Sequence, residues 1–374
     1  VLVQTPPAVP LLMIAQLVCF MRRSQLVIDW HNLGYTLMEV DCRPGPAIRL
    51  YRFLEHTFGR GASANFCVSQ AMQRWLQTEW GISATVLHDK PQSIFRQYGV
   101  EDTHNLFVNT NRSMLAPPAL DDQFSDESTP FTFRNANNEL CRRSPTDAQG
   151  MALIVSSTSW TGDEDFSILL RALKLYDDKA ATDDNLPSVL AVITGNGPKR
   201  AYYEAQIQAM QMQSVFIRTG YLNEYRDYAI LLSSAHLGIS LHMSSSGIDL
   251  PMKVVDMFGC KLPVLALTFP ALPELVQHER NGMHIVNDVN AVQVMADHLA
   301  QLLTKTDKLQ ELKANVRLAS WQESWNAIAL PVFEERLKAP TRAPASVPLF
   351  LAVCISLCGF AILVVSLVWY FTDD

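Results

Sequence analysis

Short apolar runs alternate with amphipathic helical patterns along most of this chain, and this alternation limits the folds that it can adopt. Runs typical of strands lie at 26–31, 64–69, 84–87, 152–156, 189–194, 215–218, 237–241, 263–267 and 284–286. Helical patterns lie at 10–21, 48–58, 70–80, 166–176, 199–212, 225–234, 251–258, 272–277, 291–303 and 308–319. Such alternation is typical of parallel sheets with helices on both faces. The sequence therefore predicts an α/β protein with two Rossmann-like, doubly wound domains.

The composition divides the chain into five segments. A first domain at 1–94 is followed at 95–150 by a polar stretch of weak periodicity, which we expect to be an irregular linker or insertion. We expect a complete second domain at 151–335, a linker at 336–346 and a final apolar segment at 347–371. The sequence opens inside a strand-like run, without a signal peptide, so we interpret the first domain as N-terminally incomplete.

The apolar segment 347–371 contains no Asp, Glu, Lys, Arg or His. It is long enough to cross a bilayer, which needs roughly 20 apolar residues in a helix. Trp369 and Tyr370, near its end, fit an interfacial aromatic belt. Basic residues precede it between 336 and 342 and only two aspartates follow, so we expect the rest of the chain on the cytosolic side. We predict a C-terminal transmembrane helix; a buried core helix is the alternative.

Charge and cysteine content exclude some classes of function. The chain has 37 acidic and 30 basic side chains, a formal charge of −7, and no cluster of Lys and Arg. We expect no nucleic-acid partner, because phosphate contacts need clustered basic residues. The seven cysteines are irregularly spaced and form no CxxC pair, which argues against a disulfide framework and a metal site. We expect no metal and no tightly bound cofactor.

A serine-rich turn after the predicted strand 237–241 is the first candidate ligand site. Residues 244–247 are small and precede a helical pattern, so their backbone N–H groups and the helix dipole favour an anion such as a diphosphate. Lys253 follows in the first turn, where it can neutralise phosphate charge. Asp256 lies one turn further, where a carboxylate can accept hydrogen bonds from ribose hydroxyls. The pattern alone also fits an ordinary N-capped helix.

The residues from Gly247 to Val264 follow the pattern Gly-x-Asp-Leu-Pro-Met-Lys-x-x-Asp-Met-Phe-Gly-Cys-x-Leu-Pro-Val. This pattern resembles the donor motif of two-domain Rossmann-like (GT-B) glycosyltransferases. More closely, the chain resembles the chitobiosyldiphosphodolichol β-mannosyltransferase family. Further stretches that resemble this family lie at 26–32, 155–161, 163–170, 192–195 and 278–282. Several ordered matches make the resemblance specific.

The resemblance implies transfer of mannose from GDP-mannose to dolichyl-diphosphate-chitobiose through a β-1,4 linkage, an early step of lipid-linked oligosaccharide assembly for protein N-glycosylation. It implies an endoplasmic reticulum membrane protein with cytosolic catalytic domains, where 1–94 is the acceptor side and 151–335 binds the nucleotide-sugar. It also suggests membrane lipids and other dolichol-pathway mannosyltransferases as partners. The net stereochemistry is inverting, so we expect a general base on the acceptor hydroxyl.

The residues that we expect to bind the donor are Ser245, Ser246, Gly247, Asp249, Lys253, Asp256 and Gly195. Many relatives of the broad fold carry two glutamates in the donor motif; here the second falls at Asp256, and Asp249 is only a candidate for the first. Many also carry an Arg and a Lys after the first strand of this domain, whereas the same loop is acidic here at 163–165. We interpret this Asp-Glu-Asp as the first turn of a helix rather than a metal-binding pair. We expect Lys253 and amides near 245–247 to take most of the diphosphate charge.

His31 is our first candidate for the general base, because it follows a predicted buried strand and imidazole titrates near neutrality. Asp29 can orient this imidazole or serve instead, and both residues also fit a structural role. Trp321 and Trp325 fit either attachment of the closing helices to the first domain or ordinary core packing.

Two other classes of function stay open. One is another GT-B transferase with a different nucleotide-sugar, which donor competition would distinguish. The other is a non-catalytic membrane partner of such an enzyme. A stripe of Arg49, Arg52 and Arg60 fits anionic lipid headgroups, the acceptor diphosphate or a solvated face. Because the first domain lacks its opening strand–helix loop, we expect the chain as printed to be inactive by itself.

Overall fold

The computed structural model describes residues 1–41, 45–110, 112–162 and 164–338. It divides the chain into two compact units. Of the described residues, the first unit contains those within 1–88 and 322–338, and the second contains those within 89–321. The second unit thus begins earlier and ends earlier than the domain expected at 151–335.

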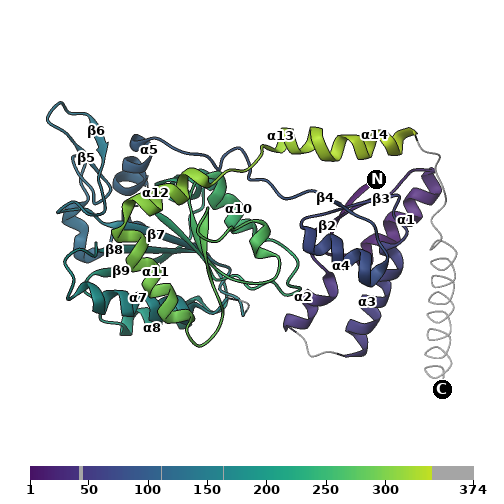
Figure 1. Cartoon of the computed structure of the whole chain (residues 1–374), viewed down its shortest axis with the longest axis horizontal. Helices are drawn as coiled ribbons and strands as arrows, with labels where there is room; N and C mark the ends of the chain where they lie inside the picture. The colour runs from purple at the N-terminus through teal and green to yellow at the C-terminus, as the bar shows by residue number, and fades with distance from the viewer. Residues whose placement is uncertain (42–44, 111, 163, 339–374) are drawn as a thin grey trace, which may run out of the picture. The chain divides into compact units, whose positions relative to one another are not determined.

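The first unit is built on a four-stranded parallel sheet of order β1-β2-β3-β4. Its strands are β1 (Leu2–Thr5), β2 (Val27–Trp30), β3 (Ala64–Cys67) and β4 (Thr85–Val86). Its helices are α1 (Leu11–Arg22), α2 (Gly34–Asp41), α3 (Pro46–Gly59), α4 (Gln70–Trp80), η4 (Trp325–Ala329) and α14 (Leu330–Lys338), with α13 (Trp321–Ser324) at the boundary. In Figure 1, α14 lies on one side of this sheet and α3 and α4 on the other.

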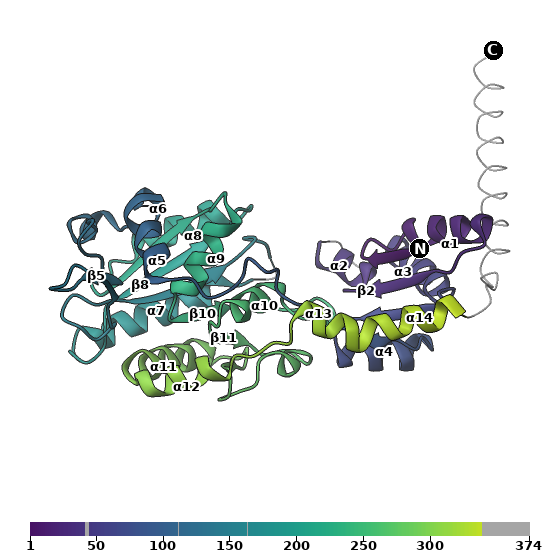
Figure 2. The same cartoon turned by 90° about the horizontal axis from the view of Figure 1, so that it is seen from above.

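The last described helix packs on the sheet of the first unit, and Figure 2 shows it from above. The Phe333 ring lies 5.7 Å from Phe66 of β3 and 5.5 Å from the Trp325 ring, between ring centroids. Trp325 therefore attaches the last described helix to the first unit, whereas Trp321 is half-exposed. Sequence reasoning placed this segment in the second domain, because an amphipathic pattern does not show which sheet a helix covers.

Helix α2 was missed from the sequence, and a buried carboxylate explains its start. Glu55 of α3 is fully buried and accepts hydrogen bonds from the backbone N–H groups of Gly34, at 2.7 Å, and Tyr35, at 3.2 Å. These are donors of the first turn of α2, which otherwise lack partners. Burial raises the pKa of Glu55 to about 7, although both hydrogen bonds oppose this rise.

The second unit is a six-stranded parallel sheet of order β12-β11-β10-β7-β8-β9. Its strands are β7 (Ala152–Ser157), β8 (Val189–Thr194), β9 (Val215–Gly220), β10 (Leu237–Ser240), β11 (Val264–Leu267) and β12 (Gly282–Ile285). Its helices are α7 (Phe166–Ala180), α8 (Arg200–Ala209), α9 (Tyr225–Ser234), α10 (Met252–Gly259), η3 (Leu272–Glu274), α11 (Ala291–Thr304) and α12 (Thr306–Asn315). Figure 1 shows α7, α8 and α11 on one face and α10 on the other. The strand order reverses between β7 and β10, as in a doubly wound sheet.

The segment expected to be irregular at 95–150 is folded into the second unit. It contains α5 (Val100–Asn105), η1 (Leu106–Thr110), α6 (Arg112–Leu115), η2 (Pro118–Gln123) and the hairpin β5 (Thr132–Arg134) with β6 (Leu140–Arg142). Phe107 is fully buried, with its ring centroid 4.5 Å from Phe131 and 6.2 Å from Phe124. A few aromatic side chains thus form a small core within a polar stretch, so the expectation of an irregular linker was wrong.

Within the described residues, no helix combines the length and apolar character needed to cross a membrane. The transmembrane helix predicted at 347–371 and most of the linker predicted at 336–346 lie outside the described residues.

Candidate functional site

The second unit places its candidate ligand residues where a doubly wound sheet binds ligands. Such sheets bind at the carboxyl ends of the strands, beside the point where strand order reverses. Here β7 and β10 are neighbours at that point, and an isolated bridge between Glu164 and His242 joins the segments that follow them. Three of the seven predicted donor residues line a cavity at this edge, and the other four lie in the serine-rich loop.

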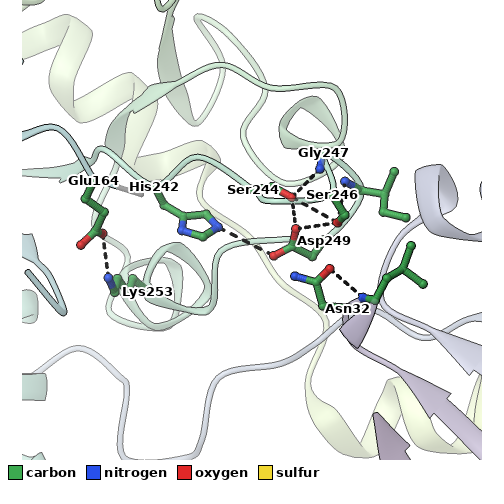
Figure 3. A network of polar contacts seen from close by, with 10 residues as sticks. Asn32, Glu164, His242, Ser244, Ser246, Gly247, Asp249 and Lys253 are labelled. Carbon is green, nitrogen blue, oxygen red and sulfur yellow. Dashed lines mark hydrogen bonds and ion pairs between the residues drawn. The ribbon is translucent and has the colours of Figure 1, made fainter. Parts of the chain in front are cut away.

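The serine-rich loop is held by its own hydrogen bonds, which Figure 3 shows. The Ser244 hydroxyl donates to Oδ1 of Asp249 and accepts from the backbone N–H of Gly247 at 2.7 Å. Gly247 adopts a φ of 74°, which favours glycine over residues with a side chain. The Ser246 hydroxyl lies 3.4 Å from Asp249 Oδ1, and Ser245 is exposed. The Gly247 amide, which we expected to be available to a phosphate, is therefore engaged within the loop.

Asp249 is the centre of this loop rather than an open ligand contact. Its side chain is buried, with 9% of the residue exposed. Burial raises the pKa of this carboxyl, but the hydrogen bonds from His242 and Ser244 outweigh it and the net pKa is lowered. His242 Nε2 lies 3.7 Å from Asp249 Oδ2 (Figure 3). The arrangement favours an ionised Asp249 that fixes the shape of the loop before α10.

Lys253 forms an ion pair that the sequence did not indicate. Its Nζ lies 2.7 Å from Oε1 of Glu164, 89 residues earlier in the chain (Figure 3). Glu164 is 2% exposed, whereas the Lys253 side chain is 30% exposed. The other carboxylate oxygen of Glu164 accepts from the Thr158 hydroxyl and from the backbone N–H of Ser159. The pair thus links the segment after β7 to the first turn of α10.

This geometry corrects the interpretation of the acidic loop at 163–165 as a simple first turn. Asp165 is the N-cap of α7 and accepts from the Ser167 backbone N–H at 2.9 Å. Glu164 lies before the helix and points into the protein, and Asp163 lies outside the described residues. Among the residues that the structure describes, no group of three or more His, Cys, Asp or Glu side chains is arranged to hold a metal ion.

A cavity of about 250 Å³ opens beside Lys253. Its lining residues lie at or directly after the carboxyl ends of β7, β8 and β9, or on α9 and α10: Ser157, Thr158, Thr194, Gly195, Tyr221, Leu222, Asn223, Tyr225, Tyr228, Lys253 and Asp256. Its volume is just below the roughly 300–1,000 Å³ of typical small-molecule sites. The structure therefore brings together Gly195, Lys253 and Asp256, three of the residues that the sequence suggests as donor ligands.

Asp256 and Tyr228 are two ionisable side chains of the cavity whose pKa values are raised by burial. Burial raises the pKa of Asp256 to about 7, so this carboxyl can be protonated near neutral pH and can donate as well as accept. The Tyr228 hydroxyl lies 2.7 Å from Ser157 Oγ, and burial raises its pKa well above the ordinary value. The sequence did not indicate the three tyrosines of the cavity, Tyr221, Tyr225 and Tyr228, because the loop and the helix that carry them contain no recognisable motif.

Gly195 is fixed by close backbone contacts at the end of β8. Its φ is 143°, and a Cβ atom at this position would lie 1.7 Å from the carbonyl oxygen of Thr158. Its own carbonyl accepts from Nε1 of Trp160 at 3.0 Å. Only glycine allows the loops after β7 and β8 to approach this closely.

In the first unit, the side chains of His31 and Asp29 are in contact, so the structure brings the two candidates for the general base together. Nε2 of His31 lies 3.0 Å from Oδ2 of Asp29, and both side chains are about one-quarter exposed. Asp29 belongs to β2 and His31 directly follows its carboxyl end, where the backbone N–H of His31 bonds to the carbonyl of Thr5 at 2.9 Å. A carboxylate bonded to an imidazole that stays open to solvent is an arrangement suited to proton transfer.

Comparison with known proteins shows the family to which the chain belongs. Residues 141–319 match the family described as glycosyl transferases group 1. A chitobiosyldiphosphodolichol beta-mannosyltransferase of Mus musculus is 40% identical over 355 residues, which cover 92% of this chain and 72% of that protein. The chain belongs to the chitobiosyldiphosphodolichol beta-mannosyltransferase family. It is therefore a glycosyltransferase with the expected GT-B fold.

Two further similarities bear on the donor and the fold. The UDP-glycosyltransferase TURAN of Arabidopsis thaliana is 37% identical to this chain, over 89% of the chain and 76% of that protein. The crystal structure of Anabaena Alr3699/HepE in complex with UDP has a TM-score of 0.57 at 15% identity, covering 90% of this chain and 77% of that one. At this identity the second similarity concerns the fold alone.

Proposed function

We propose that this member of the chitobiosyldiphosphodolichol beta-mannosyltransferase family transfers mannose from GDP-mannose to dolichyl-diphosphate-chitobiose. The product is a β-1,4 linkage formed with inversion, at an early step of lipid-linked oligosaccharide assembly. The observation that carries this proposal is 40% identity over most of the chain to relatives of that name, from mouse and human among others. We place the reaction at the endoplasmic reticulum membrane, with the two units on the cytosolic side.

The donor diphosphate is assigned to the cavity beside Lys253. An ammonium group has three donors, and Glu164 takes one of them, so the others remain for phosphate oxygens. The ion pair is neutral overall, so we expect directional hydrogen bonds and the positive end of α10 to matter more than net charge. Asp256 is proposed to bind ribose hydroxyls, and the backbone around Gly195 lines the nucleoside.

The general base is proposed to be His31, held by Asp29. In an inverting displacement the base removes the proton of the acceptor hydroxyl while the carbon–oxygen bond to GDP breaks. The carboxylate of Asp29 fixes the ring and stabilises the imidazolium that forms. Ser245, Ser246, Gly247 and Asp249 are proposed to shape the loop around the donor rather than to carry its charge.

Donor binding tests the first half of this proposal. Calorimetric titration with GDP-mannose and GDP, compared with UDP-glucose and UDP, should show binding of the guanosine nucleotides alone. Lys253→Met should weaken GDP-mannose binding about tenfold or more, which corresponds to about 1.4 kcal/mol for a lost charged hydrogen bond. Met252→Leu, at the exposed neighbouring position of α10, is the matched control. Undiminished affinity of the Lys253→Met variant would contradict the assignment of the diphosphate.

Transfer tests the second half. Mannose transfer from GDP-mannose to chitobiosyl-diphosphate-lipid should be detected with the full-length protein that contains this chain, and the product should be sensitive to a β-mannosidase. The alternative is a transferase that uses a uridine nucleotide, which the name of the Arabidopsis relative favours. Preferred binding of UDP-sugars in the titration would replace the proposal by this alternative.

A further inference from the structure

Lys253 is the single basic residue among the described residues that line the cavity of about 250 Å³. Its Nζ lies 2.7 Å from Oε1 of Glu164, as Figure 3 shows. Glu164 does not line the cavity, and its side chain is 2% exposed. The carboxylate therefore acts on a ligand of the cavity through Lys253 rather than by direct contact.

Both oxygens of the Glu164 carboxylate are held by groups of the protein. Oε1 accepts from Lys253, and Oε2 accepts from the Thr158 hydroxyl and from the backbone N–H of Ser159. A backbone bridge to His242 holds Glu164 itself between the segments that follow β7 and β10. A free lysine side chain samples many rotamers, and ordering it on a ligand lowers the affinity. Glu164 restricts Lys253 before a ligand arrives, so less freedom is lost on binding.

The same carboxylate takes a hydrogen-bond donor away from the cavity. Thr158 lines the cavity, but its hydroxyl donates to Glu164 and accepts from the backbone N–H of Trp160 at 2.7 Å. A threonine hydroxyl has one hydrogen, so Thr158 has none left for a phosphate oxygen. Of the two lining side chains that contact Glu164, the one that can still donate to an anion is therefore Lys253.

The negative charge of Glu164 affects two ligands of such a cavity differently. The diphosphate of a nucleotide-sugar carries one charge on each phosphate, whereas the terminal phosphate of a free nucleoside diphosphate carries nearly one charge more at neutral pH. Two groups bonded to one ammonium lie about 5 Å apart. With an effective dielectric constant of about 50, the repulsion between Glu164 and this extra charge corresponds to about a tenfold change in affinity.

We propose that Glu164 is a positioning residue that directs Lys253 to the donor diphosphate and favours release of the nucleoside diphosphate after transfer. The inference rests on the proposed function in one respect, because it places the diphosphate beside Lys253. The buried carboxylate keeps the ammonium in place before the donor binds. Its charge then disfavours the ligand that has lost its sugar.

Calorimetric titration of the Glu164→Gln variant tests this role. GDP-mannose and the β-methyl ester of GDP carry the same diphosphate charge, and GDP carries more. The affinity for GDP relative to that for the methyl ester should be about tenfold higher in the variant than in the unmodified protein. Glu164→Asp keeps the charge but shortens the side chain, so affinity for all three ligands should fall together. A relative affinity in Glu164→Gln within about twofold of the unmodified protein would overturn the proposal.

Asp165→Asn is the matched control. It removes one acidic charge from the next position, where the Asp165 side chain caps α7 and accepts from the backbone N–H of Ser167. Its relative affinity for GDP should equal that of the unmodified protein. An equal rise in Asp165→Asn and Glu164→Gln would indicate a general effect of net charge, and this result would also overturn the role of Glu164.

Product inhibition gives a second measurement, in the full-length protein that contains this chain. In Glu164→Gln, the inhibition constant of GDP divided by the KM for GDP-mannose should fall about tenfold. Loss of folded protein lowers the rate without changing this quotient, so a merely structural role predicts no change. If Glu164→Gln does not fold, the unmodified protein decides: GDP bound more than about tenfold tighter than its methyl ester overturns the proposal, and affinities within about threefold support it.

Failure of the proposed function gives a different result. Absence of guanosine-nucleotide binding by the unmodified protein contradicts the proposed donor and not the role of Glu164. UDP, its β-methyl ester and UDP-glucose then replace the guanosine ligands, because the diphosphate is common to both series. An unchanged relative affinity in that series overturns the role of Glu164, whichever base the cavity binds.

Discussion

Removing Lys253 from its ion pair with Glu164 should lower the free energy of unfolding more than removing the charge of Glu164 does. Removing one partner of a buried pair costs about 3–5 kcal/mol, because the other charge is left buried. Lys253→Met leaves the carboxylate of Glu164, which is 2% exposed, with only a hydroxyl and an amide. We expect a loss of about 2–3 kcal/mol, below the full value because Lys253 is itself 30% exposed. Glu164→Gln should cost about 1 kcal/mol, since the lysine can turn to water.

The double variant Glu164→Gln with Lys253→Met isolates the pair. If the loss in Lys253→Met comes from a stranded carboxylate, removing that carboxylate should recover about 1–2 kcal/mol. Urea denaturation, monitored by hydrogen exchange of peptides from β7 and α10, gives the free energy of unfolding of the second unit. Additivity within about 0.5 kcal/mol would refute the reasoning, because uncoupled sites behave in this way. Met252→Leu, on the exposed side of the same helix turn, should leave the free energy of unfolding unchanged.

Three further predictions concern single residues. Gly195→Ala should lower the free energy of unfolding by roughly 2–4 kcal/mol, because its Cβ would meet the Thr158 carbonyl, and an unchanged melting temperature would contradict this. Burial raises the pKa of Asp256 to about 7. The folded state therefore holds the proton of Asp256 more tightly than the unfolded state does. The free energy of unfolding should fall by roughly 2–3 kcal/mol as the pH rises from about 4 to about 7. Asp256→Asn should remove this contribution, which urea titrations across that pH range can measure. His31→Gln should lower kcat by about 10²–10⁴ with donor affinity unchanged, and Asp29→Asn should lower it less; a kcat within about threefold of the unmodified protein would exclude His31 as the base.

The alternation of strands and helices along the two parallel sheets followed from the sequence, whereas helix α2 and the elements at 100–142 did not. Runs such as 189–194 are long, apolar and bounded by turn residues, so their pattern is local and needs no knowledge of the fold. The helix expected at 272–277 is instead a short 3₁₀ turn, Leu272–Glu274, with a proline in its first turn. Gly195 could be singled out for the same local reason, since its place directly after a strand fixes the edge of the sheet at which it lies.

The sequence by itself determined the α/β class and the family resemblance, and it singled out three residues that line the cavity, because each of these depends on neighbouring residues. Only the tertiary structure decided that Glu164 pairs with Lys253, that Asp249 serves its own loop, and that the helix after Trp325 belongs to the first unit. Each of these depends on groups far apart in the chain, and charge or periodicity along a sequence does not indicate which distant partner a side chain meets in the fold. The acidic loop at 163–165 illustrates this difference: its charge was visible in the sequence, but the buried environment that makes Glu164 a partner of Lys253 was not.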